Sequence, residues 1–318
     1  MKSIAVLMPT KNSANWLHEV LAPILAQSSE YDIKLVLVDG YSTDGTVQKA
    51  MGWFPDVIVV YDVSRNLAIA RNICLVEGRK LKTDYMAFID SDVVVPLDFF
   101  KRMIRHLDNP QVAISALRFE LEHDPPKYFV GKYYRNRTDI ARSGIAKTDY
   151  TTTACSMWKS KRARGIVLDE RLKRAGEDVD FNLQLIEKGD FYAIVDSDEP
   201  HAIHIRPATI REELHRVKDH GMARALLMKL HKKGLNPGRY KKTILAGILT
   251  ALGWIGLVLA LLFKIFWPWG LVPFCLIFLR QWMKTRDLWR LDYVLFGFLL
   301  SIIYFTRFIQ GAVSYRKA

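Results

Sequence analysis

Residues 85–92 read Tyr-Met-Ala-Phe-Ile-Asp-Ser-Asp, an apolar run that ends in two carboxylates. The first five residues have the length and composition of a buried strand, so a strand is predicted over Tyr85–Ile89. Asp90 and Asp92 follow at once, with only the small Ser91 between them. Such a pair at a strand end can hold a divalent cation while substrate phosphates complete the metal's coordination shell. Alone the pair is a weak signal, because aspartate is also common in turns.

Apolar runs of this kind alternate with helical periodicity up to about residue 120. The runs of strand length are Ser3–Met8, Ile33–Val38, Val57–Tyr61, Tyr85–Ile89 and Val112–Ala116. The stretches of helical periodicity are Asn15–Gln27, Asp44–Gly52, Leu67–Lys80 and Leu97–Leu107. The alternation predicts β-α-β units and an α/β fold with a mainly parallel, Rossmann-like sheet. Functional loops are then expected at the carboxyl ends of the strands, after Met8, Val38 and Ile89.

Other motifs accompany the Asp-Ser-Asp stretch in a defined order. They are Met8-Pro9-Thr10-Lys11-Asn12, Val38-Asp39-Gly40, Ala70-Arg71-Asn72, Leu168-Asp169-Glu170 and Gly176-Glu177-Asp178. Together, over roughly residues 3–205, these segments resemble the family-two inverting glycosyltransferases of the GT-A fold. The resemblance implies a nucleotide-sugar glycosyltransferase domain over residues 1–205.

The resemblance also implies nucleotide-binding roles. Asp39 matches the acid that receives the base of a nucleotide sugar, and Asp90 faces the ribose and phosphate. The residues expected to bind the nucleotide are Pro9, Thr10, Asp39, Arg71, Asp90 and Ser91. The family often has a second acid after the position of Asp39, where this chain has Gly40. That difference leaves Asp44 as a helix cap or a nucleotide contact.

The same resemblance implies a bound metal ion and a catalytic base. Asp92 matches the residue that coordinates Mg²⁺ or Mn²⁺, and His204, rather than His201, is expected as a further ligand. Inverting transfer needs a base that takes the proton of the acceptor, and Asp178 is expected in that role with Glu177 supporting it. The alternative is that these two acids only stabilise the first turn of a helix.

The basic charge of the chain lies in its C-terminal third. Lys and Arg number 46 against 33 Asp and Glu, a net charge of +13, and half of all residues are hydrophobic. Residues 201–318 hold 19 of the basic residues and 5 of the acidic ones, which leaves 27 and 28 for residues 1–200. A nucleic-acid enzyme would carry its positive charge on the globular domain. The charge asymmetry instead favours contact between the basic C-terminal third and an anionic membrane surface.

The apolar pattern after residue 205 also favours a membrane. Residues 206–242 are basic, and Thr209–Leu230 within them predicts an amphipathic interfacial helix. Residues 243–318 contain three apolar stretches, Thr243–Phe263, Ile265–Leu279 and Tyr293–Gly311. The first is long enough to span a bilayer, so two or three spans are expected. The basic loop after Leu279 indicates a cytoplasmic side, shared with the N-terminal domain.

The expected function is metal-dependent inverting transfer of a sugar from a UDP- or GDP-sugar to a lipid-linked acceptor. Polyprenyl or dolichyl phosphate and a glycolipid are the acceptors considered, and no nucleic-acid partner is expected. The first alternative is a processive polysaccharide synthase, although Gln281-Trp282 matches its Gln-x-x-Arg-Trp segment poorly. The second is a non-catalytic membrane scaffold that binds nucleotide sugar. Cys74, Cys155 and Cys275 have no metal or disulfide spacing.

Overall fold

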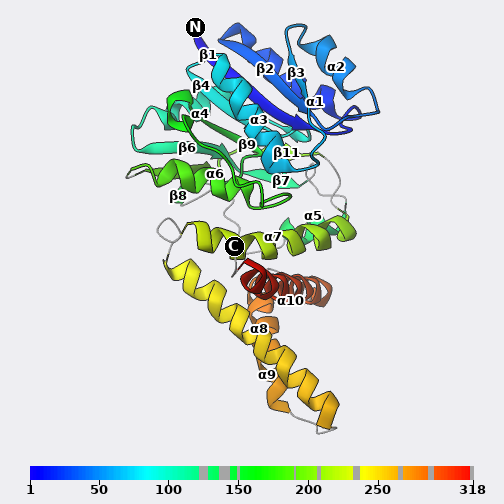
Figure 1. Cartoon of the computed structure of the whole chain (residues 1–318). Coiled ribbons are helices and arrows are strands. Elements are labelled where there is room, and N and C mark those ends of the chain that lie inside the picture. Colours follow the sequence, from blue (N-terminus) through cyan, green and yellow to red (C-terminus); the bar gives the residue numbers. More distant parts are fainter. Residues whose placement is uncertain are drawn as a thin grey trace. The chain divides into compact units, whose positions relative to one another are not determined.

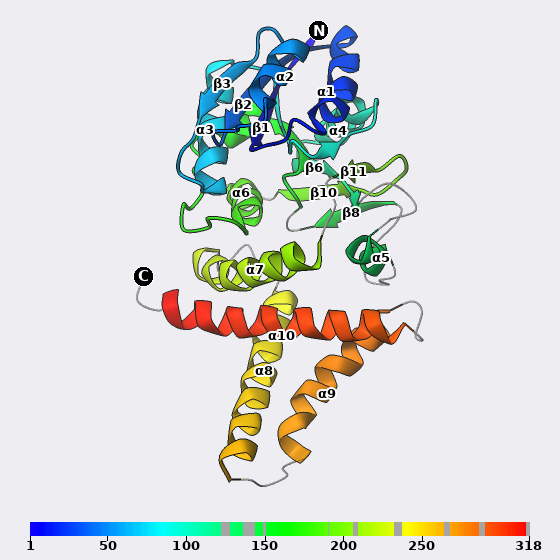
Figure 2. The same ribbon diagram turned by 90° about the vertical axis from the view of Figure 1, so that its right-hand side faces the viewer.

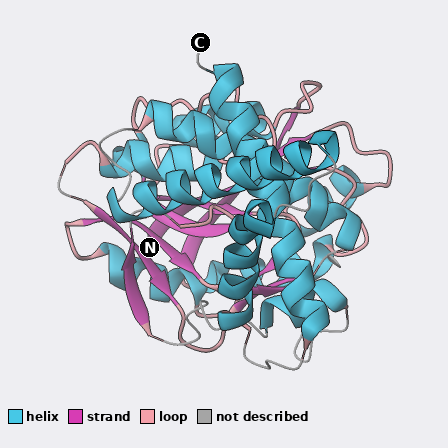
Figure 3. Cartoon of the chain, turned by 90° about the horizontal axis from the view of Figure 1, so that it is seen from below, coloured by secondary structure: helices cyan, strands magenta, loops and turns pink. Residues whose placement is uncertain are grey.

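The computed structural model describes the chain except residues 122–127, 136–143, 149–150, 190, 206–208, 232–236, 264–267, 286–289 and 316–318. Lys127 and Arg137, which belong to a stretch of basic and aromatic residues in the sequence, lie outside the described residues. The chain divides into two compact units, Met1–Lys127 with Arg142–Pro207 and Tyr128–Ala141 with Ala208–Ala318. Every described strand belongs to the first unit, whereas the described part of the second unit is helical (Figures 1 and 3).

An eight-stranded sheet forms the first unit, in the order β3-β2-β1-β4-β9-β6-β10-β8. Its strands are β1 (Lys2–Thr10), β2 (Tyr31–Asp39), β3 (Ile58–Tyr61), β4 (Tyr85–Ile89), β6 (Val112–Leu117), β8 (Ile145–Thr148), β9 (Cys155–Lys159) and β10 (Tyr192–Asp196). The first four strands of the sheet order are parallel, as are β6 and β10, while β9 is antiparallel to β4 and β6. The predicted α/β class with a mostly parallel sheet is confirmed.

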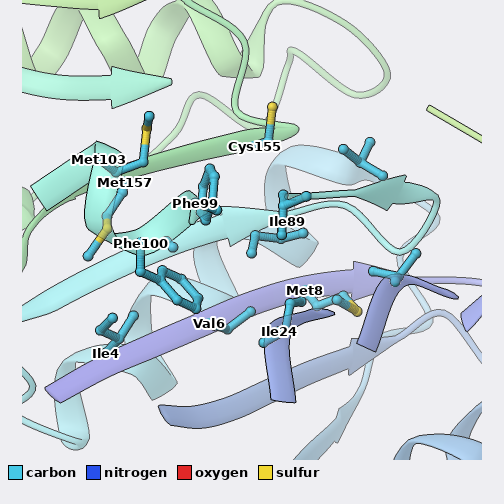
Figure 4. Close-up of a cluster of buried hydrophobic side chains, with 14 of the residues drawn as sticks. Ile4, Val6, Met8, Ile24, Ile89, Phe99, Phe100, Met103, Cys155 and Met157 are labelled. Atoms are coloured by element: carbon cyan, nitrogen blue, oxygen red, sulfur yellow. The ribbon is translucent and has the colours of Figure 1, made fainter. Parts of the chain in front are cut away.

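Helices cover both faces of this sheet. They are α1 (Leu17–Ala26), α2 (Thr46–Trp53), α3 (Leu67–Lys80), α4 (Phe99–Leu107) and α6 (Glu177–Ile186), with short 3-10 turns η1 (Gln27–Ser29) and η2 (Ser160–Ala163). Successive side chains of a strand point to opposite faces. Ile4, Val6 and Met8 of β1 therefore join one buried cluster with α1 and α4 (Figure 4), while Ala5 and Leu7 join another with α3 and α6. Because the helices cover the faces of the sheet, the loops that carry the predicted motifs lie at the ends of its strands.

A small second sheet follows the Asp-Ser-Asp turn. It consists of β5 (Val93–Val94), β11 (Ala202–His204) and β7 (Phe119–Leu121), in the order β5-β11-β7. β11 is antiparallel to β5 and places His204 opposite Val93. The backbone N–H of Ile205 donates to the Asp92 carbonyl at 2.9 Å. Strand pairing thus brings two residues together that are more than a hundred positions apart in the chain.

The helical unit contains α5 (Phe129–Arg135), α7 (Ile210–Leu230), α8 (Pro237–Phe263), α9 (Pro268–Met283) and α10 (Leu291–Ser314). A capping box between Thr209 and Glu212 begins α7. Figure 2 shows α8 and α9 side by side as a hairpin, with α10 running across it and beside α7. Glycines permit that approach: a Cβ at Gly221 of α7 would overlap the Tyr304 carbonyl of α10, and one at Gly311 would lie 2.9 Å from the Met222 carbonyl.

Among the described residues, α10 is the one helix long and apolar enough to cross a membrane. Shorter apolar stretches, Thr243–Ile255 and Val272–Met283, lie in α8 and α9. The expectation of two or three spans therefore stays a prediction. The packing of α10 along α7 and across the hairpin distinguishes it from a third helix bundled lengthwise with α8 and α9.

Candidate active site

The Asp-Ser-Asp stretch forms a turn where β4 leaves the sheet. The backbone N–H of Asp90 donates to the Ala154 carbonyl at 2.9 Å, and the N–H of Val93 donates to the Asp90 carbonyl at 3.0 Å. These bonds fix the turn on both sides of Ser91. The side chains of Asp90 and Asp92 are partly exposed, at 27% and 22%, so both carboxylates are reachable from solvent.

A hydroxyl chain connects this turn to the loop after β1. Thr10 Oγ1 donates to Ser13 Oγ at 3.1 Å, and Ser13 Oγ lies 2.8 Å from Ser91 Oγ. Thr10 follows Pro9 at the end of β1, so these two predicted nucleotide-binding residues lie at the same strand-end edge as the Asp-Ser-Asp turn. Ser13 was not predicted, because a lone serine after a strand carries no distinguishing spacing.

Asp39 ends β2 and is fully buried. Its Oδ2 accepts from the Ser42 backbone N–H at 2.8 Å and its Oδ1 accepts from the Ser42 hydroxyl at 2.5 Å. The carboxylate therefore closes the loop after β2 in this structure. Asp44, five residues after Asp39, accepts from the Thr46 backbone N–H at 3.1 Å and so helps to cap α2. Its pKa is lowered by these hydrogen bonds against the effect of burial.

Arg71 of α3 links the two acidic motifs. Its side chain is 3% exposed, with Nη2 3.0 Å from Asp90 Oδ1 and Nε 3.4 Å from Glu177 Oε1. The guanidinium carbon lies 4.9 Å from the centre of the Phe88 ring, within cation–π range. Burial alone would lower the pKa of Arg71, but Asp90, Glu177 and Asp178 together raise it. The resemblance places this arginine near the nucleotide; the structure places it between carboxylates.

Glu177 and Asp178 begin α6, directly after Gly176, whose φ of 86° is accessible to glycine. Glu177 is 4% exposed and Asp180 is 2% exposed, and Asp180 accepts from the Asp169 backbone N–H at 2.8 Å. Asp178 is less buried than either of them. Of the acids in this first turn, Asp178 is therefore the most accessible to a substrate.

Carboxylates outnumber cations in this cluster. The guanidinium of Arg71 carries one positive charge and interacts electrostatically with the carboxylates of Asp90, Glu177 and Asp178. Burial raises the pKa of Glu177, the charge of Asp178 raises it further, and Arg71 opposes both effects. The excess negative charge would be relieved by a proton on Glu177 or by a bound cation.

Asp92 and His204 form a pair beside this cluster. His204 Nε2 lies 3.4 Å from Asp92 Oδ2, and His204 is 25% exposed. An oxygen and a nitrogen donor at that separation fit a divalent cation whose remaining ligands come from substrate phosphates and water. The described residues hold no group of three or more His, Cys, Asp or Glu side chains arranged for a metal. His201 lies elsewhere, with Nε2 2.8 Å from the Ser197 carbonyl and Nδ1 3.1 Å from Glu199 Oε1.

This arrangement defines a class: a mixed α/β domain of the GT-A kind whose acidic motifs gather at the ends of its parallel strands. The sequence profile of glycosyl transferase family 2 matches residues 5–176, more than half of the chain. The chain belongs to glycosyl transferase family 2 and is a glycosyltransferase.

Its relatives agree with this assignment. It is 25% identical over 199 residues to the pre-mycofactocin glycosyltransferase of Mycobacterium tuberculosis, covering 59% of this chain. The chain spans 40% of the length of that relative. Among solved structures it is similar in fold to S. aureus TarS residues 1–349 in complex with UDP-GlcNAc, with a TM-score of 0.54, 15% identity, and coverage of 100% of this chain and 92% of that one. The structure of TarS 1–349 without that ligand gives a TM-score of 0.53 at 17% identity, with the same coverage.

Proposed function

We propose that this glycosyltransferase uses a divalent cation and transfers a sugar, with inversion, from a UDP- or GDP-sugar to a lipid-linked acceptor at a membrane. The single observation that carries the catalytic part is the Arg71 cluster. It unites two carboxylate motifs, Asp90-Ser91-Asp92 and Glu177-Asp178, that lie nearly ninety residues apart.

The donor is expected to lie over the ends of β1, β2 and β4. Thr10, Ser91 and Asp90 provide hydroxyl and carboxylate groups there, as nucleotide recognition requires. Asp39 already accepts from Ser42, but a carboxylate has further lone pairs and can also accept a base N–H after a small shift of that turn. The UDP-GlcNAc complex of TarS supports a nucleotide-sugar donor for this fold.

Asp92 and His204 would hold Mg²⁺ or Mn²⁺. A bound cation would neutralise the charge that develops on the departing diphosphate. Ser91, between the two aspartates, is fixed by Ser13, which helps to hold the turn in position. The excess of carboxylates over Arg71 supports such a site, because a further cation would balance the cluster.

Asp178 is proposed as the base. Glu177 is buried against Arg71 and Asp180 is held by α6 and its neighbouring loop, so Asp178 is the carboxylate best able to approach an acceptor hydroxyl. It would take the acceptor proton as the acceptor oxygen attacks the anomeric carbon. An acceptor that is already an ionised phosphate needs little deprotonation, and Asp178 would then orient it.

The membrane part of the proposal rests on exposed apolar side chains of the helical unit. Those on α8, α9 and α10 include Leu245, Ile248, Leu252, Ile255, Leu276, Leu279, Leu291, Leu295 and Leu299. An apolar surface of this extent marks a membrane or protein interface. The 16 residues of α9 reach about 24 Å, less than the roughly 30 Å of a bilayer core. We infer that the α8–α9 hairpin enters the bilayer from one side and that α7 and α10 lie at the surface.

The test uses the full chain purified in detergent. It is incubated with labelled UDP- and GDP-sugars, Mg²⁺ or Mn²⁺, and polyprenyl phosphate, and label entering the organic phase is measured. Metal-dependent transfer to lipid is expected. Donor hydrolysis without transfer would retain the enzyme and reject this acceptor, while absence of nucleotide-sugar binding would contradict the proposal.

A further inference from the structure

Two tyrosines lie at the carboxyl ends of neighbouring strands in the first unit. Tyr41 is the second residue after β2, and Tyr61 ends β3, which is at one edge of the sheet. The centroids of the two rings are 5.4 Å apart, and the ring planes meet at 46°. Tyr41 is 57% exposed and Tyr61 is 55% exposed, so the pair presents an aromatic surface to solvent. Neither tyrosine was among the residues expected to bind the nucleotide.

The strand register places this pair beside Asp39. β2 and β3 are parallel, and Asp39 is paired with Tyr61. Two residues earlier in each strand, Leu37 and Val59 are paired, and both side chains belong to the buried cluster that includes α1 and α4. Because side chains alternate along a strand, Asp39 and Tyr61 point to this same face. Open parallel sheets bind ligands outside the carboxyl ends of their strands, so the tyrosines lie beside the carboxylate expected to receive the base.

The backbone of Tyr41 is left-handed, with a φ of 58°. This region is disfavoured for residues with a Cβ, and most of all for bulky ones. In the described part of the chain, four residues other than glycine have such a φ. Three of them, Asn12, Tyr41 and Arg65, follow β1, β2 and β3, whereas Lys82 precedes β4. Strained residues of this kind are concentrated at ligand sites, and three lie here at one edge of the sheet.

Hydrogen bonds on both sides hold Tyr41 in this conformation. Before it, the backbone N–H of Gly40 donates to the Thr10 carbonyl at 2.8 Å. After it, the hydroxyl oxygen of Ser42 accepts from the Asn12 backbone N–H at 2.8 Å. The loop after β2 is therefore fastened to the loop after β1, and the backbone of Tyr41 is fixed before any ligand arrives. A fixed backbone lowers the entropy that binding would otherwise lose.

The fold itself gains little from the Tyr41 ring. More than half of this residue is exposed, and its ring contacts that of Tyr61, which is exposed to the same extent. Glycine would adopt the loop conformation with less strain, as Gly45 does four residues further on with a φ of 87°. A strained and exposed tyrosine, at a position where the backbone suits glycine, indicates that its ring contacts a ligand.

We propose that the Tyr41 ring, supported by the Tyr61 ring, stacks on the base of the donor nucleotide. The inference rests on the proposed nucleotide-sugar function, in which Asp39 accepts a hydrogen bond from the edge of the same base. Every nucleobase has a flat π-face, and stacking on an aromatic side chain stabilises its binding. The carboxylate then contacts the edge of the base, while the tyrosines contact its face.

The test titrates the full chain, in detergent, with UDP and with GDP by calorimetry, and measures thermal unfolding of the same samples. Y41G removes the ring and relieves the left-handed strain. It should bind the preferred nucleotide about tenfold or more weakly, because the stacking contact is lost. Its thermal midpoint should not fall, because the relieved strain offsets the lost contact with Tyr61. Y41F keeps an aromatic ring and should retain most of the affinity.

K82G is the matched control, because Lys82 is exposed and has a φ of 53° at the amino end of β4. It relieves the same kind of strain and should leave nucleotide affinity within about twofold of the wild type. Three results would overturn the stacking role: unchanged affinity in Y41G, equal weakening in Y41G and K82G, or equal weakening in Y41G and Y41F. A wild-type chain that binds neither nucleotide would contradict the proposed function as well, so the two failures are distinguishable.

Discussion

At the scale of single residues, the candidate site is built from contacts between segments that lie far apart in the chain. The Asp-Ser-Asp and Glu-Asp motifs were recognisable from residue types and order alone. The pairing of Asp92 with His204 and the burial of Arg71 between Asp90 and Glu177 depend on how distant segments pack. No local pattern encodes such contacts, so their geometry had to come from the fold.

Substitution can test the separate roles proposed for Asp178, as the base, and for Glu177, as the buried partner of Arg71. D178N should lower transfer to a hydroxyl acceptor by about 10²- to 10⁴-fold, because the proton acceptor is removed. Its donor affinity and thermal midpoint should change little, since Asp178 is only partly buried. E177Q should instead lower stability, because Arg71 loses a buried partner. Full transfer activity in D178N would remove Asp178 from the base role.

Asp196 provides a pH prediction away from the site. Although burial opposes it, hydrogen bonds from Arg102 and His106 lower the pKa of Asp196 to about 2. A carboxyl whose pKa is lowered by folding stabilises the protein above its unfolded pKa near 3.9, and that stabilisation disappears as the pH falls toward 2. Denaturant unfolding should therefore show a lower free energy of unfolding for D196N than for wild type at pH 7. The loss of the charged Asp196 carboxylate should contribute on the order of 1 kcal/mol to that difference.

The stability gap between wild type and D196N should narrow between pH 5 and pH 3. D32N, which removes an exposed carboxylate beside Lys34, should show no comparable gap. A D196N gap that stays constant with pH would contradict the assignment of that stabilisation to the Asp196 charge.

At the scale of elements, segments with a clear apolar or helical pattern were predictable, and a strand without such a pattern was not. Leu67–Lys80 and Tyr85–Ile89 form α3 and β4 with the predicted bounds. β9, by contrast, lies in a region for which no strand was predicted, yet it is buried between β4 and β6. Cys155–Lys159 lacks the continuous apolar run of Tyr85–Ile89, and its strand conformation comes from pairing with distant partners.

The crossing of α7 and α10 gives a prediction with an internal control. G221A should destabilise the protein by about 1–3 kcal/mol, because its Cβ would overlap the Tyr304 carbonyl. G52A lies in α2 with nothing within 4 Å of an added Cβ, and alanine favours helix by up to about 1 kcal/mol. Thermal unfolding should show opposite signs for the two variants. A neutral G221A would show that the helices do not pack this closely.

At the scale of the whole molecule, charge, apolar surface and chemistry are divided between the units. The acidic site lies in the first unit, while the helices with exposed apolar side chains lie in the second. The charge asymmetry of the sequence predicted this division. The path of α10 across the hairpin was not predictable, because its length and composition equally suit a membrane span.

Membrane topology can be measured with single cysteines. Cys74 and Cys155 are buried, so C275S leaves no exposed thiol among the described residues. In that background M51C reports on the first unit and V313C on the end of α10, and both native side chains are exposed. A membrane-impermeant maleimide should label both from the same side of sealed vesicles, because the proposed hairpin returns to its side of entry. Labelling from opposite sides would make α10 a span.

The most direct measurement of the central claim is the rate of sugar transfer as Mn²⁺ or Mg²⁺ is titrated, in wild type, D92N and D56N. Asp56 is an exposed carboxylate outside the site and serves as the control. The account predicts saturable metal dependence in wild type and D56N, and a loss of about 100-fold or more in D92N at every metal concentration. Metal-independent transfer, or a D92N enzyme as active as D56N, would contradict it.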